Sequence, residues 1–181
     1  LYPTMETLRD QGKLRFIGVS TRYAADPEQA GAEVALKTYP HLWDVVMLKY
    51  GILNQHAAKE MLPLAIRHSI GVMNMAALRF KLPDPDQLED LIEEWKHAGQ
   101  IPLTSMPSDD PLGWLIHDDV TSVVSAGYKF AADHPAVSTV ITGTANLSHL
   151  EENVRALEVP RLSVNDTNQV KDLLGHIVEY A

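Results

Sequence analysis

The strongest candidate for chemistry is a strand–turn–helix sequence at residues 137–153, VSTVITGTANLSHLEEN. Val137, Val140 and Ile141 make a short β-branched apolar run, as is typical of a strand. Gly143 would allow a sharp turn and a close approach to a ligand. Asn146 can cap the following helix, and Ser148 with Glu151 offers an alternative start as a capping box. Free N–H groups at such a helix start can bind an anion, although an ordinary βα turn without a ligand has similar features.

Other chemistries find less support. The eight histidines form no H-x-x-x-H or H-E-x-x-H pattern, so we expect no metal site. His117-Asp118-Asp119 could chelate a cation, but a solvated acidic turn is the favoured interpretation. No serine lies in a G-x-S-x-G elbow, and the absence of cysteine excludes thiolate catalysis. Tyr50 could donate a proton, but a packing role is favoured.

Composition limits the partners. The 181 residues are 45% hydrophobic and carry a formal net charge of −9, which predicts a globular protein and disfavours nucleic acid and anionic membrane surfaces. No apolar run approaches the ~18 residues of a membrane span, and the first residues show no signal pattern. The lack of cysteine is compatible with a reducing compartment, so we predict a cytoplasmic location. The sequence does not begin with Met, which suggests a fragment, a processed chain or a truncated gene.

The elements that must position these residues alternate between strand and helix. The apolar runs predict four strands, at residues 13–20, 44–50, 70–75 and 137–141. Because these runs are apolar on both sides, we expect the strands to be covered on both faces of the sheet. The predicted helices cover residues 4–11, 26–37, 57–68, 86–98, 120–133, 147–157 and 165–180. In the helix that begins near residue 147, Leu147, Leu150, Val154 and Leu157 form one apolar face. Residues 99–119 form an irregular insert, with Met106 and Trp114, that either contacts substrate or caps the barrel; we favour the cap.

This alternation predicts an α/β protein with a parallel sheet. Because a (β/α)8 TIM barrel needs about 250 residues, the length fits its second half: four parallel strands with flanking helices and a C-terminal helix. The carboxyl ends of such strands share one face, where ligands bind. That face would collect Ser20 and Thr21, Lys49 and Tyr50, Arg79, and the turn at residues 143–153.

Several motifs resemble the aldo/keto reductase family, specifically a divergent branch of it. Residues 12–20, GKLRFIGVS, are similar to the family's GK-x-R-x-IGVS strand. Residues 60–65 and 70–72 resemble its LLPLA and GIGV motifs, and residues 134–153 resemble HPGV, VIPGT and HLEEN in the same order. The resemblance begins near the family's fifth strand and implies that residues 1–181 are the C-terminal, cofactor-binding half of one barrel domain. The family's catalytic Asp, Tyr, Lys and His lie on earlier strands, so the N-terminal half and any catalytic residue are absent here.

The resemblance also implies a cofactor site for NAD(P)(H). Ser20 and Thr21 match the residues that hold the nicotinamide carboxamide, and Met47 stands where the family commonly has Gln. Met75 replaces the aromatic residue beside the nicotinamide ring, and a thioether can still pack on that ring. The loop from Ala76 through Leu78 to Arg79 matches the pyrophosphate loop. The adenosine and its phosphate are matched by Gly143, Thr144, His149, Glu152 and Asn153.

The cofactor preference follows from two of these positions. Gly143 and His149 stand where relatives that use NADP often carry Lys and Arg. A 2′-phosphate is bound best by fixed cations. We therefore predict comparable or better use of NAD.

The function implied is an oxidoreductase that interconverts a small carbonyl compound and an alcohol, with this chain inactive alone. One alternative is a non-catalytic nucleotide-binding or regulatory half-barrel, which could self-associate through exposed barrel edges. Another is a poorly folded fragment. A D-x-x-x-x-Y motif upstream, followed by Lys and His at strand ends, would indicate the enzyme.

Overall fold

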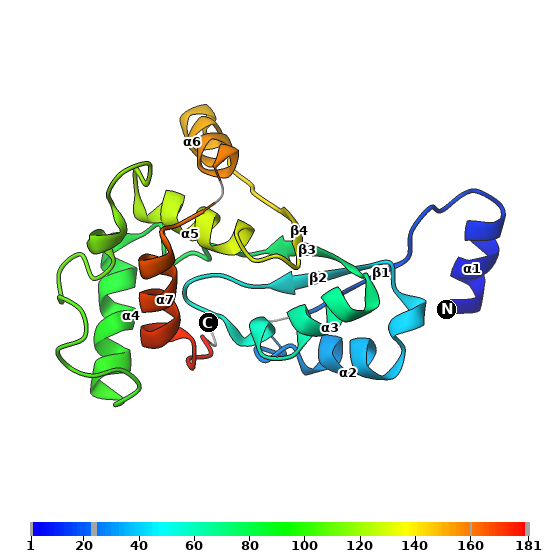
Figure 1. Ribbon diagram of the computed structural model, residues 1–181, viewed down its shortest axis with the longest axis horizontal. Helices are drawn as coiled ribbons and strands as arrows, with labels where there is room; N and C mark the ends of the chain where they lie inside the picture. Colours follow the sequence, from blue (N-terminus) through cyan, green and yellow to red (C-terminus); the bar gives the residue numbers. More distant parts are fainter. Residues whose placement is uncertain (1, 23–24, 160, 180–181) are drawn as a thin grey trace.

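Four parallel strands form the centre of the molecule. The computed structural model describes residues 2–22, 25–159 and 161–179. The strands pair in the consecutive order β1 (Gly18–Ser20), β2 (Val45–Lys49), β3 (Gly71–Met75) and β4 (Val137–Val140) (Figure 1). Every pairing is parallel, so the prediction of four parallel strands is confirmed. A consecutive order is that of a sheet that winds in one direction, as in a barrel.

Helices flank this sheet. They are α1 (Tyr2–Asp10), α2 (Ala30–Thr38), α3 (Met61–His68), α4 (Pro85–His97), α5 (Val123–Ala132), α6 (Leu147–Glu158) and α7 (Val164–Leu174). Short 3-10 helices cover Pro40–Leu42, His56–Ala58 and Gly113–Leu115. α2 packs on α3, and α5 packs on β4 and α6. Among the described residues, no helix is both long and apolar enough to cross a membrane.

The two faces of the sheet differ in burial. Val46 and Leu48 of β2 and Val72 of β3 are buried in the hydrophobic core. The alternate residues, such as Met47 and Met73, are only half-buried. The expectation that the strands are covered on both faces is therefore wrong for this chain. Helices cover one face, and no described strand lies opposite the other.

Three predicted boundaries also differ from the structure. The first strand begins at Gly18 and not at residue 13, because only residues 18–20 pair with β2. α2 begins at Ala30, and the carboxylate of Asp26 accepts hydrogen bonds from the backbone of Ala30 (2.9 Å) and Gly31 (2.8 Å). Asp26 thus caps the helix from a preceding turn. α7 ends at Leu174, short of the predicted end at Tyr180, a residue that lies outside the described ones.

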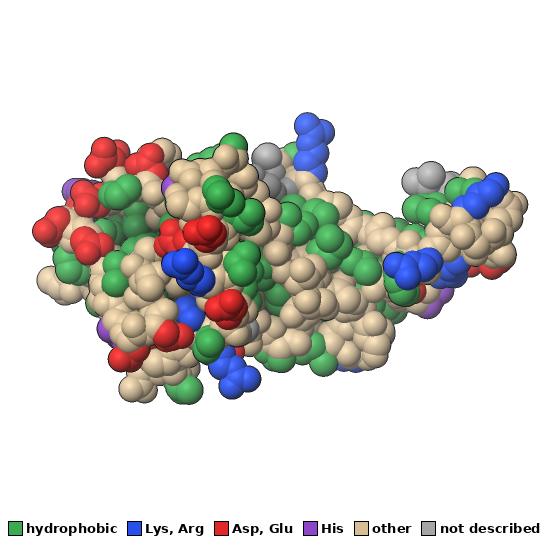
Figure 2. All heavy atoms as spheres, turned by 90° about the horizontal axis from the view of Figure 1, so that it is seen from above, with side chains coloured by type: hydrophobic (Ala, Val, Ile, Leu, Met, Phe, Trp, Pro, Cys, Tyr) green, Lys and Arg blue, Asp and Glu red, His purple; other side chains and the backbone are tan. Residues whose placement is uncertain are grey.

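α6 and α1 stand out from the body of the molecule. α6 projects from one side, and α1 lies at the end of a narrow arm (Figures 1 and 2). Leu147, Leu150 and Val154 on the apolar face of α6 are 70%, 43% and 52% exposed. α1 has no buried residue among those described. Both helices therefore present surface that the described part of the chain leaves uncovered.

Candidate functional site

The carboxyl ends of β1 and β2 place two predicted cofactor residues side by side. Ser20 pairs with Met47 in the strand register, and its Oγ lies 3.6 Å from Met47 Sδ. Val46 and Leu48 point to the opposite, helix-covered face because successive side chains of a strand alternate. Ser20 is exposed and Met47 half-buried, so this pair lies on the open face of the sheet. A hydroxyl and a thioether there can contact a planar ligand.

Beyond the end of β1, the side chain of Gln29 pairs with the backbone of β2. Its side chain accepts a hydrogen bond from Lys49 N (2.7 Å) and donates one to Lys49 O (3.0 Å). Thr21 Oγ1 donates to the same Gln29 oxygen at 3.3 Å. Gln29 is fully buried and adopts φ 58°, a left-handed conformation. Sequence reasoning missed this residue, which positions Thr21 beside β2.

The loop after β3 is locked against the loop after β2. A Cβ on Gly51 would lie 2.2 Å from the carbonyl oxygen of Ala77, so this approach requires glycine. Asn74 Nδ2 donates to Tyr50 O at 2.7 Å. Ala76 and Arg79 both have φ 55°. The predicted pyrophosphate loop therefore has a specific backbone shape, held in place by buried contacts.

The remaining residues of this loop point in different directions. Met75 pairs with Lys49 in the strand register, beside the open face. Leu78 packs against α5, where a Cβ on Gly127 would lie 2.5 Å from its Cδ2. The guanidinium of Arg79 lies 5.4 Å from the ring centroid of Phe80. Of this loop, Leu78 thus has a packing role, while Met75 and Arg79 lie near the carboxyl edge of the sheet.

The turn after β4 is open to solvent. Gly143, Thr144 and His149 are exposed, and a Cβ on Gly143 would meet nothing within 4 Å. Gly143 does not have a positive φ, so the turn does not need glycine for its conformation, contrary to expectation. Asn146 caps α6 by accepting from Ser148 N at 2.9 Å, which confirms the predicted cap and not the alternative capping box.

Glu152 and Asn153, which are predicted to bind adenosine, make hydrogen bonds within the protein that connect α6 to α5. Ser122 Oγ donates a short hydrogen bond to Glu152, and Asn153 Nδ2 donates to Thr142 Oγ1 at 2.6 Å. Tyr128 of α5 donates to the same Thr142 oxygen at 2.8 Å. Asn153 is only 4% exposed. These contacts separate Glu152 and Asn153 from the exposed residues of the turn.

A basic cluster forms at the same edge of the sheet. Lys49 Nζ lies 2.6 Å from Oε2 of Glu179, and Arg79 Nε lies 3.7 Å from the same oxygen. Lys81 Nζ lies 3.7 Å from Oε1. Burial lowers the pKa of Lys49, and its hydrogen bond to Glu179 opposes this shift. The polar pattern of the strand ends included Lys49 and Arg79, but no sequence signal connects them to Glu179, 130 residues from Lys49.

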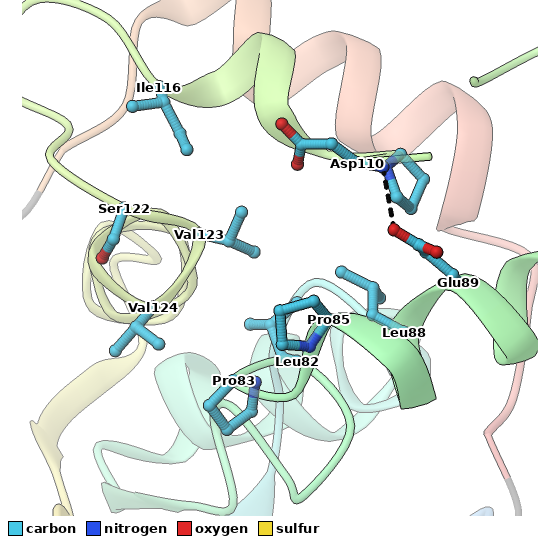
Figure 3. A pocket seen from close by; sticks show the side chains of 11 residues that line it. Leu82, Pro83, Pro85, Leu88, Glu89, Asp110, Ile116, Ser122, Val123 and Val124 are labelled. Atoms are coloured by element: carbon cyan, nitrogen blue, oxygen red, sulfur yellow. Dashed lines mark hydrogen bonds between the residues drawn. The ribbon is translucent and has the colours of Figure 1, made fainter. Parts of the chain in front are cut away.

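An apolar cavity of about 350 Å³ lies between the N-terminal ends of α4 and α5 and the insert (Figure 3). Leu82, Leu88, Ile116 and Val123 are part of its lining. At its rim, Glu89 accepts a hydrogen bond from Asp110 N at 3.2 Å. The cavity has few polar groups that could orient a ligand. Elsewhere in the insert Met106 is 5% exposed and packs in the core, which is a structural use of this segment.

The side chains of His117 and Asp119 form ion pairs with other residues of the protein. His117 Nδ1 and Nε2 each lie 3.0 Å from a carboxylate, of Asp118 and Asp166 respectively. Asp119 pairs with Lys129 at 2.8 Å. Among the residues that the structure describes, no group of three or more histidines and carboxylates could hold a metal ion.

The four parallel strands and their flanking helices define an α/β protein, with polar side chains at the carboxyl ends of the strands. The chain belongs to the aldo/keto reductase family, whose model matches residues 1–174. This match confirms the resemblance noted in the motifs.

Individual relatives are more distant. The chain is 23% identical over 175 residues to a Bacillus subtilis (strain 168) protein described as "Uncharacterized oxidoreductase YqkF", covering 94% of this chain and 53% of that protein. Its fold is similar to the holo and apo structures of aldo-keto reductase AKR11C1 from Bacillus halodurans, each with a TM-score of 0.62 and 21% identity. The match covers 99% of this chain and 56% of AKR11C1. The chain therefore spans about half the length of these relatives.

Proposed function

We propose that residues 1–181 form the C-terminal, cofactor-binding half of a single aldo/keto reductase barrel. The whole protein would be an NAD(P)(H)-dependent oxidoreductase that interconverts a small carbonyl compound and an alcohol. The parallel pairing of β1, β2, β3 and β4 in consecutive order carries this proposal, because parallel strands bring the loops after every strand to one edge. Four strands are half of an eight-stranded barrel, and the relatives are about twice as long. No residue of this chain is assigned a catalytic role.

The cofactor would lie across the carboxyl edge and supply the hydride. The Ser20 hydroxyl and Thr21 would bind the carboxamide, and the half-buried sulfur atoms of Met47 and Met75 would contact the nicotinamide ring. Backbone N–H groups from Ala76 to Arg79 would face the pyrophosphate.

At the other end of the cofactor, Gly143, Thr144 and His149 are exposed and have space for the adenosine ribose. Glu152 and Asn153 would take part only by exchanging their internal hydrogen bonds for contacts with adenosine. The turn at residues 143–149 contains no Lys or Arg. It therefore suits NAD at least as well as NADP, because a 2′-phosphate prefers a fixed cation.

Titration of the chain with NADH and with NADPH, followed by fluorescence, tests the proposal. We expect NADH to bind at least as tightly as NADPH, with the same order in a protein that includes the upstream sequence. A tenfold preference for NADPH, about 1.4 kcal/mol, would contradict the assignment of the exposed turn. If neither NADH nor NADPH binds at millimolar concentrations, the isolated chain is not a nucleotide-binding unit.

The second candidate is a non-catalytic nucleotide-binding or regulatory half-barrel that pairs with another half. The sheet edges favour it: among the described residues, β1 and β4 each pair with one strand only. Unpaired strand edges and the exposed apolar face of α6 would promote self-association. Light scattering measures the mass of the species in solution, and the upstream sequence distinguishes the two candidates by the presence or absence of the catalytic Asp, Tyr, Lys and His.

A further inference from the structure

Three basic side chains converge on one carboxylate at the carboxyl edge of the sheet. Lys49 ends β2, Arg79 and Lys81 belong to the loop after β3, and Glu179 follows α7 in the C-terminal tail. The side chains of Lys49 and Glu179 are each 2% exposed, and those of Arg79 and Lys81 are 10% and 23% exposed. Burial of the Glu179 carboxylate beside cations from β2 and from the loop after β3 costs free energy unless the charges are matched there. The arrangement is therefore a built anion site, filled by a side chain of the protein itself.

The carboxylate fits this site incompletely. Only Lys49 approaches Glu179 within hydrogen-bond distance, at 2.6 Å, whereas Arg79 and Lys81 remain at 3.7 Å. Among the residues that the structure describes, Oε1 of Glu179 accepts no hydrogen bond although it is buried. A carboxylate has two oxygens on one carbon, but a pyrophosphate has more oxygens over a greater span. An oligophosphate could therefore contact all three cations more closely.

Among the described residues, Glu179 makes two further polar contacts, both through its carbonyl oxygen. The carbonyl oxygen of Glu179 accepts from Asn54 Nδ2 at 3.4 Å and from Lys49 Nζ at 3.5 Å, both long for hydrogen bonds. Ile177, two residues earlier, is buried and anchors the end of α7. The ion pair with Lys49, at 2.6 Å, is thus the shortest polar contact that Glu179 makes with the described residues.

The position of this cluster links it to the proposed cofactor. Lys49 pairs with Met75 in the strand register, and Arg79 lies in the proposed pyrophosphate loop. We propose that Lys49, Arg79 and Lys81 bind a pyrophosphate group, and that Glu179 occupies their site as an autoinhibitory mimic of that group until the ligand displaces it. The proposal rests on the proposed function for the identity of the ligand as a dinucleotide; the competition between Glu179 and an oligophosphate stands independently.

Calorimetric titration with inorganic pyrophosphate tests the competition. Glu179→Gln removes the charge that fills the site and keeps the shape, so we expect it to bind pyrophosphate about tenfold more tightly than the wild type, within the usual range of coupling between competing ligands. Adding Lys81→Met to Glu179→Gln should reverse most of that gain. Glu94→Gln, an exposed position on α4 with the same change in charge, should bind as the wild type does. Equal affinities of the wild type and Glu179→Gln would overturn the proposal.

A second test measures the release of Glu179 in the unaltered protein. This test decides the matter if circular dichroism shows that Glu179→Gln does not fold. A serine carboxypeptidase should remove Glu179 faster in saturating pyrophosphate than in sulfate of equal ionic strength. An unchanged or slower rate would overturn the proposal.

The same titrations with NADH separate the two hypotheses. Tighter pyrophosphate binding by Glu179→Gln without any NADH binding would support the tail as a plug and contradict the proposed cofactor. NADH binding of equal strength in both proteins would support the cofactor and overturn the plug.

Discussion

Gln29 offers the sharpest test of how the strand ends are built. β1 stops at Ser20, yet the last residue of β2 still needs partners for its backbone groups. The Gln29 amide provides them, at 2.7 Å to Lys49 N and 3.0 Å to Lys49 O. Replacement Gln29→Ala would leave a buried N–H and a buried C=O without these partners. At about 1–3 kcal/mol for each orphaned group, the loss is about 2–6 kcal/mol, and entry of water would bring it to about 3 kcal/mol.

Urea unfolding followed by circular dichroism measures this loss. Gln29→Gly removes the same side-chain amide as Gln29→Ala, but φ 58° strains alanine and not glycine. Comparing the two variants therefore separates the loss of the hydrogen bonds from the backbone strain. We expect Gln29→Gly to be more stable than Gln29→Ala by about 1 kcal/mol and still well below the wild type. Gln169→Ala, at an exposed site in the middle of α7, should change stability by no more than about 0.5 kcal/mol. If Gln29→Ala behaves like Gln169→Ala, the inferred pairing does not stabilise the sheet edge.

Three further predictions concern the loops. Gly51→Ala should destabilise the protein by about 1–3 kcal/mol in urea unfolding, because its Cβ would lie 2.2 Å from the backbone oxygen of Ala77. His149→Arg should raise the affinity for NADPH about tenfold relative to NADH in fluorescence titrations, since it places a fixed cation in the exposed turn. The pKa of His117 is raised, first by its hydrogen bond to Asp118 and also by the charge of Asp166. Its contribution to stability is therefore complete below the unfolded pKa, about 6.5, and is lost as the pH rises through the higher folded pKa.

Each of these has a matched control. Gly143→Ala meets nothing within 4 Å and should leave stability nearly unchanged; equal losses at Gly51 and Gly143 would contradict the steric argument. His41 is exposed and far along the chain from the turn, so His41→Arg should not alter the cofactor ratio. An unchanged ratio in His149→Arg would argue against the predicted 2′-phosphate position. For His117, urea midpoints of the wild type and His117→Gln should converge as the pH rises; parallel curves would refute the linkage.

Local features of the fold could be predicted from the sequence. Apolar β-branched runs identified four strands, and their spacing from helical segments indicated a parallel sheet. Asn146 was predicted to cap α6 and does so, because a cap depends on residues only two or three positions away. The family was also recognisable from motifs of adjacent residues, and residues 1–174 match its model.

Burial was harder to predict than secondary structure. The apolar stripe of α6 is correctly helical, but Leu147 and Leu150 remain exposed because nothing in the described chain covers them. The strands were expected to be covered on both faces, whereas Met47 lies on a half-buried one. A residue pattern shows which side is apolar, and only the neighbouring elements decide whether that side is covered.

The sequence alone determined the four strands, their alternation with helices, the Asn146 cap and the family, since these depend on residues close together in the chain. Tertiary structure decided which distant groups meet: Gln29 replaces a strand beside Lys49, and Glu179 enters a basic cluster 130 residues away. No spacing rule predicts such contacts, because each requires the whole sheet to bring separate loops to one edge. Burial then makes them energetically important, since a polar group removed from water needs a partner wherever the fold places one.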